Sequence, residues 1–168
     1  MARKKKTLPT WKDVKAEIQK FDREGLQGLV RDLYAASKSN QSFLHARLNL
    51  GTDQLKPFKD TISRWINPDI MLNQPISVSK SKKAIAEYRK AIGRPEGMAE
   101  LSVFYCEEAF DFLESCGLED EGYFLALIRM YDLATDYVLQ LGPADRTTYV
   151  ERLNKLRSRA SSVGWGVE

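Results

Sequence analysis

The sequence predicts an all-α fold: a single domain of about eight helices, packed as antiparallel pairs into a bundle with a solenoid-like tendency. Apolar residues recur every three or four positions along most of the chain, which is typical of helices with one buried face. No stretch shows the apolar–polar alternation between turn residues that predicts a β-strand. The chain is 43% hydrophobic and 29% charged, a composition that excludes a wholly disordered protein.

Caps and apolar stripes predict the first helices. Thr10 begins a helix that continues to Phe21, with Asp13 three residues after Thr10 as a weaker form of the capping box. Residues 26–34 place apolar side chains at the i, i+3, i+4, i+7 and i+8 positions of a core-facing helix. A short third helix is expected over residues 41–48.

Glycine and proline mark the limits of the later helices. Gly51 ends the third helix, and a fourth begins at Thr52 with Pro57 in its first turn, where proline is tolerated. Residues 67–78 have no helical period and predict an ordered loop. The next helices are expected to end before glycines and to cover residues 79–92, 96–116 and 121–141, and a final helix carries the apolar residues Tyr149, Val150, Leu153, Leu156 and Ala160.

Length and cysteine content set the expected organisation. The 168 residues suit one domain over 10–168 after a basic, flexible N-terminus over 1–9. Cys106 and Cys116 are separated by roughly 15 Å of helical rise, too far for a disulfide, so we expect two buried, reduced thiols in a cytoplasmic protein. No apolar stretch reaches the roughly 18 residues that span a bilayer, so no membrane partner is expected.

Charge is segregated along the chain, although its net value is only +3. Residues 95–136 hold eleven acidic side chains and one basic side chain. Within this stretch, Glu100, Glu107, Asp111 and Glu114 recur at spacings of seven, four and three, which places them on one helix face. The simplest interpretation is a solvated face, and the alternative is a docking surface for a basic protein partner. The Glu-x-x-His pairs of di-iron bundles are absent, so no metal or other cofactor is expected.

Two further features suggest partners. Trp165 lies between two glycines, where it either packs into a groove or anchors a protein partner. Basic residues in segments 1–20, 79–94 and 146–159 predict an alternative function, accessory nucleic-acid binding, which requires several segments to converge. The candidate residues for that function are Arg3, Lys4, Lys5, Lys6, Lys80, Lys82, Lys83, Arg89, Lys90, Arg152, Lys155 and Arg159.

No group of residues predicts a catalytic site. His45 is the only histidine, which excludes sites that need two imidazoles. Cys106 and Cys116 lie among aromatic residues, where burial raises the pKa of a thiol and makes it unreactive. An enzyme would need a pocket that joins His45 or a thiol to carboxylates of distant helices. The predicted function is therefore a non-catalytic helical interaction module that binds a protein partner, with its oligomeric state left open.

Several segments together resemble an uncharacterised bacterial family of all-helical proteins. The similarity begins with LQGLVRDLY at residues 26–34 and FLHARL at residues 43–48. It continues through SKKAIAEY at 81–88 and GYFLAL at 122–127 to the Gly-Trp-Gly at 164–166. The resemblance covers most of the chain from about residue 10 onward. It implies a small, helical, cytoplasmic domain, and it carries no known activity or site residues.

Overall fold

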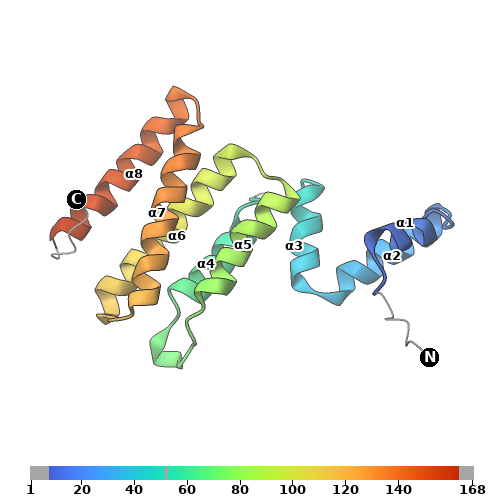
Figure 1. Cartoon of the computed structure of the whole chain (residues 1–168), viewed down its shortest axis with the longest axis horizontal. Coiled ribbons are helices and arrows are strands. Elements are labelled where there is room, and N and C mark those ends of the chain that lie inside the picture. The colour runs from blue at the N-terminus through green and yellow to red at the C-terminus, as the bar shows by residue number, and fades with distance from the viewer. Residues whose placement is uncertain (1–7, 52, 163–168) are drawn as a thin grey trace, which may run out of the picture. The chain divides into compact units, whose positions relative to one another are not determined.

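A computed structural model describes residues 8–51 and 53–162 and shows a helical chain (Figure 1). Over these residues there are eight α-helices, one 3₁₀-helix and no strand, which confirms the predicted all-α class. The antiparallel pairing and the solenoid-like tendency stay predictions. The helices are α1 (Trp11–Ile18), α2 (Arg23–Ala36), α3 (Lys38–Arg47), α4 (Lys56–Ile66), η1 (Ile70–Leu72), α5 (Val78–Ala91), α6 (Pro95–Cys116), α7 (Glu121–Leu139) and α8 (Pro143–Ser162).

The chain divides into two compact units, an N-terminal unit of Met1–Gln41 and a C-terminal unit of Ser42–Glu168. Helices α1 and α2 belong to the N-terminal unit, and α4 to α8 belong to the C-terminal unit. The single domain expected over residues 10–168 stays a prediction.

Side-chain caps begin both helices of the N-terminal unit. The carboxylate of Asp13 accepts hydrogen bonds from the backbone N–H of Thr10 at 2.7 Å and from its hydroxyl at 2.8 Å, as the capping box predicts. Asp22 accepts from the backbone N–H of Gly25 at 2.7 Å. Neither helix buries a residue, so the core-facing role predicted for residues 26–34 is wrong within this unit. The physical reason is that the described residues of this unit, 8–41, form only two complete helices and no third layer that covers their apolar faces.

In the C-terminal unit, α6 lies between two pairs of helices, with α4 and α5 on one side and α7 and α8 on the other (Figure 1). Twelve of its 22 residues are buried, among them the fully buried Leu101, Val103 and Tyr105. A helix covered by neighbours on two sides needs apolar residues around most of its circumference. Helix α6 therefore forms the centre of the core and positions the side chains considered below.

Two helices of this unit begin at other residues than the sequence predicts. Helix α4 begins at Lys56 because the Asp53 carboxylate accepts from the backbone N–H groups of Leu55, at 2.9 Å, and Lys56, at 3.2 Å. Helix α5 begins at Val78 because Ser77, and not Ser79, is its N-cap. The predicted loop between α4 and α5 contains the short helix η1.

Candidate functional site

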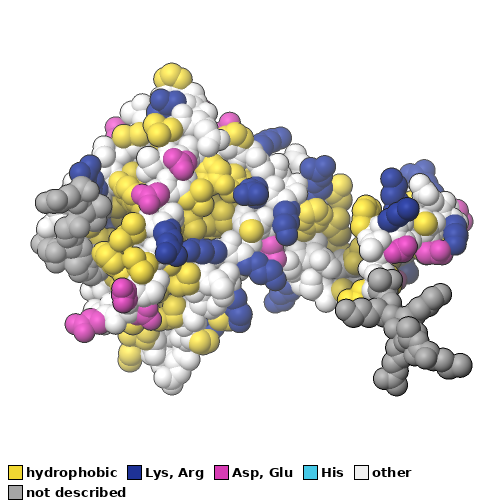
Figure 2. Space-filling view, viewed as in Figure 1, with side chains coloured by type: hydrophobic (Ala, Val, Ile, Leu, Met, Phe, Trp, Pro, Cys, Tyr) yellow, Lys and Arg dark blue, Asp and Glu magenta, His cyan; other side chains and the backbone are white. Residues whose placement is uncertain are grey.

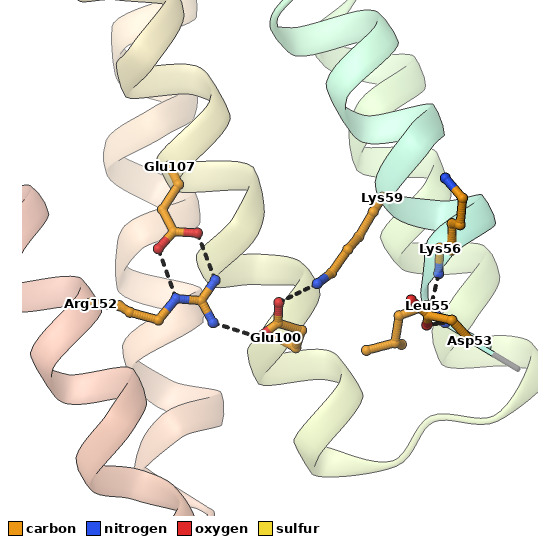
Figure 3. A network of polar contacts seen from close by, with 7 residues as sticks. All are labelled: Asp53, Leu55, Lys56, Lys59, Glu100, Glu107 and Arg152. Atoms are coloured by element: carbon orange, nitrogen blue, oxygen red, sulfur yellow. Dashed lines mark hydrogen bonds and ion pairs between the residues drawn. The ribbon is translucent and has the colours of Figure 1, made fainter.

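The acidic face of α6 is engaged by cations from two other helices. Glu100 contacts Lys59 of α4 at 2.5 Å and Arg152 of α8 at 2.5 Å. Arg152 also donates two hydrogen bonds to Glu107, at 2.8 and 2.6 Å, in a bidentate pair (Figure 3). Bidentate pairs between arginine and carboxylate are among the strongest ionic contacts and fix the geometry of both side chains. The network links α4, α6 and α8.

The remaining two carboxylates of the acidic face are paired further along the same helices. Arg159 of α8 donates to Asp111 at 2.7 Å and also to Glu114. Its guanidinium carbon lies 4.7 Å from the centroid of the Phe110 ring. All four predicted partner-binding carboxylates on α6 therefore already have a cation from this chain.

Partial burial sets the electrostatics of this network. The side chains of Glu100, Arg152 and Glu107 are 15%, 26% and 29% exposed. Burial raises the pKa of Glu100, but hydrogen bonds from Arg152 and Lys59 outweigh burial and hold this pKa below its ordinary value. Hydrogen bonds to Glu107 and Glu100 raise the pKa of Arg152. Both shifts favour the charged forms of Glu100 and Arg152.

The residues predicted to bind nucleic acid fall into two groups. Arg152 and Arg159 belong to the network above, Lys83 contacts Glu87 at 3.7 Å, and the Lys80 ammonium lies 3.7 Å from the centroid of the Trp65 ring. Among the described residues, the cations of this set with neither an ion pair nor a ring contact are Lys82, Arg89, Lys90 and Lys155. The other nucleic-acid candidates, Arg3, Lys4, Lys5 and Lys6, lie outside the described residues, and so does Trp165, a candidate residue for binding a protein partner.

A groove of about 290 Å³ lies between α5, α6 and α7, and we call it the basic groove. Lys82 and Arg89 of α5 and Arg129 of α7 border it. Within the described part of the chain, none of these three cations forms an ion pair. Three buried apolar side chains also line the groove: Ile85, Met98 and Met130. Charge patterns in the sequence do not select Arg129, because it is the one basic residue among the eleven acidic residues of segment 95–136.

The N-terminal unit carries a different surface, which we call the N-terminal stripe. It consists of seven exposed apolar side chains on α1, on α2 and in the turn between them: Trp11, Val14, Phe21, Leu26, Val30, Leu33 and Tyr34. Trp11 is 70% exposed and Leu33 is 50% exposed. Apolar and charged side chains are both visible on the surface of this unit in Figure 2.

His45 lines a pocket together with two carboxylates, and such a pocket is what the sequence predicts that an enzyme would require. The pocket measures about 350 Å³ and is also lined by Asp53 and Asp60. Both carboxylates have other partners: Asp53 caps α4, and Asp60 accepts from Lys56 at 3.0 Å. Both carboxylates therefore already make contacts at the N-terminal end of α4.

The two thiols differ in burial. Cys106 is buried, and its burial raises the pKa of the thiol, as the sequence predicts. Cys116 is half-buried, so the prediction of burial is wrong for it, and its thiol donates to the carbonyl of Phe112 at 2.9 Å. Among the described residues, no group of three or more His, Cys, Asp and Glu side chains could hold a metal ion.

No protein-family model, curated protein or solved structure matches the chain. The resemblance to an uncharacterised helical family therefore stays a prediction. In the described part of the chain, every helix is too short or too polar to cross a membrane.

Proposed function

We propose that the chain is a non-catalytic helical interaction module that binds a protein partner through the N-terminal stripe. The observation that carries this proposal is the exposure of seven apolar side chains on two helices that bury no residue. Short helices owe most of their stability to packing of the apolar face, and α1 and α2 have only 8 and 14 residues. A cluster of exposed apolar side chains bordered by charged ones is typical of a surface that another protein covers.

Charge indicates the chemistry of the partner. Residues 1–41 hold ten basic and five acidic side chains, a net charge of +5. Two copies of this unit would repel one another, whereas an apolar surface bordered by acidic residues would attract it. We therefore propose an acidic partner that presents an apolar groove or helix to the stripe. A cytoplasmic location, with both thiols reduced, is part of this proposal.

The acidic face of α6 does not contribute to this proposal. Its four carboxylates are paired with Lys59, Arg152 and Arg159, so a basic partner would have to displace contacts that are already made. The same pairs occupy two of the cations on which the alternative function, nucleic-acid binding, depends. We therefore do not propose that alternative.

A double substitution in the stripe, Val30→Glu with Leu33→Glu, is expected to abolish partner binding without unfolding the isolated chain. The two side chains are 46% and 50% exposed, so the change removes little buried apolar area from the free protein. Tagged wild-type and variant chains are compared for the proteins that they retain from their own cells, and the dissociation constant of a retained protein is measured by calorimetry. We expect binding to weaken at least about a hundredfold, in line with the loss of two central apolar contacts.

Arg31→Glu is the matched control. It changes the net charge by the same two units outside the apolar face of α2, and the one ion pair of Arg31 among the described residues is an exposed contact with Asp32 at 3.9 Å. We expect this variant to bind its partner within about threefold of wild type, since a rim charge contributes little affinity. A melting temperature that falls by several degrees in the stripe variant alone would show that the stripe is already covered within the free chain, and the proposal would be wrong.

A further inference from the structure

Three cations border the basic groove, and none of them forms an ion pair within residues 8–51 and 53–162. Lys82 and Arg89 are two helical turns apart on α5, which corresponds to roughly 10 Å of rise. Arg129 stands across the groove on α7. Arg152 and Arg159 of α8, by contrast, each contact two carboxylates. Carboxylates of α6 therefore neutralise the two arginines of α8, whereas the three cations that border the basic groove have no ion pair among the described residues.

The interior of the groove is apolar. Ile85 of α5, Met98 of α6 and Met130 of α7 are buried where the three helices meet, and all three line the groove. Two of these residues are methionines, whose unbranched, polarisable side chains adapt to different apolar partners. Leu133 adds an apolar wall that is 37% exposed. An apolar side chain that enters from outside would thus lose contact with water on several sides.

We infer that the basic groove is a second docking surface, and that its occupant is an acidic amphipathic helix of a protein partner. Carboxylates at positions i and i+7 of such a helix lie on one face, with the same separation as Lys82 and Arg89. Apolar residues at i+3 and i+4 lie between these carboxylates and face the floor of the groove. Charge complementarity favours this helix over a basic or neutral one.

This inference does not depend on the proposed function, because the basic groove and the N-terminal stripe belong to different compact units. Variants of one surface leave the residues of the other unchanged. The failure of one proposal is therefore distinguishable from the failure of the other.

A designed peptide provides the probe. It is a fluorescently labelled helix with Glu at i and i+7 and Leu at i+3 and i+4, and its control has Gln in place of both Glu residues. Binding to the full chain is measured by fluorescence anisotropy at low and moderate salt. We expect the acidic peptide to bind at least about tenfold more tightly than the Gln peptide, and we expect this difference to shrink as salt is added. Binding of the acidic peptide weaker than about 1 mM would overturn the inference.

Substitutions of two neighbouring residues of α5 distinguish binding in the groove from general electrostatic attraction to the chain. Arg89→Glu is expected to weaken binding of the acidic peptide at least about tenfold, because it places a repulsive charge beside the docked carboxylate. Lys90→Glu changes the net charge equally, and Lys90 is exposed and lies outside the groove. This control is expected to stay within about threefold of wild type. Equal losses in the two variants would mean that net charge alone attracts the peptide, and the inference would fail.

A third variant tests the apolar part of the site. Ala86 is exposed and lines the groove, so Ala86→Trp fills the groove without any change in charge. We expect this variant to reduce peptide binding at least about tenfold, because the Trp side chain occupies the apolar space that the Leu side chains of the peptide would fill. Circular dichroism verifies that each variant keeps its helices. A single-stranded oligonucleotide of the same charge is tested in parallel. If it binds in an Arg89-dependent manner and the peptide does not, the occupant is a nucleic acid and the inference is wrong.

Discussion

Replacement of Arg152 by methionine is expected to lower the free energy of unfolding by about 2–4 kcal/mol at neutral pH, a value near that for breaking a buried ion pair. Arg152 is the only cation that contacts Glu107 in the described part of the chain, and it shares Glu100 with Lys59. Methionine keeps an apolar stem of similar reach, so the variant chiefly removes charge. The Glu107 carboxylate would then be about 70% shielded from water without a counter-charge, since its side chain is 29% exposed.

The same variant is expected to change how stability depends on pH. The pKa of Glu100 in the folded protein lies below its ordinary value of 4.5, so this group contributes stability above pH 4.5 and loses that contribution as the pH falls. Without Arg152 the pKa of Glu100 rises, and less stability is lost on acidification. The difference between wild type and variant should therefore be largest near neutral pH and shrink toward about pH 3.5. Urea denaturation at both pH values measures this difference.

Two further variants show whether the ion pairs are responsible. Lys155 is exposed on the same helix and forms no ion pair among the described residues, so Lys155→Met is expected to stay within about 0.5 kcal/mol of wild type. Adding Glu100→Gln and Glu107→Gln to Arg152→Met removes the uncompensated charges and should restore most of the lost stability. A loss below about 0.5 kcal/mol for Arg152→Met, or a loss that does not vary with pH, would contradict this account.

Sequence patterns predict the helices of this protein because their causes are local. The Thr10–Asp13 cap joins residues only three positions apart, and Gly117 ends α6 in the left-handed conformation that glycine favours. The start of α4 is missed, since both Gly51 and Asp53 are turn residues and only the hydrogen bonds of Asp53 distinguish them. Element types are thus predictable here to a greater extent than their ends.

The candidate sites are harder to predict because their causes are distant in sequence. Glu100 and Glu107 both pair with Arg152, which lies 52 and 45 residues further along the chain. The sequence does not say that α8 packs against α6, and Lys59 comes from a helix 41 residues before its partner Glu100. When charges are counted segment by segment, the carboxylates of α6 and the arginines of α8 therefore look like two separate surfaces. In the structure these residues neutralise one another.

The N-terminal stripe shows a different limit of sequence patterns. Residues 26–34 have the same periodicity whether the apolar face covers a core of this chain or meets another protein. The pattern correctly predicts a helix with one apolar face. Only the absence of buried residues in α1 and α2 distinguishes this face from that of α4, where Phe58, Ile62 and Ile66 are buried.

A close approach between α5 and α6 makes Gly97 the most sensitive glycine of the helices. A Cβ atom at this position would lie 1.9 Å from the Tyr88 hydroxyl oxygen, 2.3 Å from Cζ and 2.8 Å from Cε1. Tyr88 is 3% exposed, and its ring lies edge-on to Phe58 at a centroid distance of 5.5 Å. The ring therefore has little room to move away, and one added methyl group forces the two helices apart.

Gly97→Ala is accordingly expected to lower the free energy of unfolding by about 2–3 kcal/mol, as overpacking of a core does, and the melting temperature by about 4–12 °C. In a Tyr88→Leu background the three clashing atoms are absent, so the same change should become neutral or stabilising by up to about 1 kcal/mol, the helix preference of alanine over glycine. Gly28→Ala in α2, with nothing within 4 Å of its added Cβ, should likewise stabilise the chain. Thermal and urea denaturation of the double-mutant cycle measure the coupling, and Gly97→Ala stabilising the wild-type chain would refute the close approach.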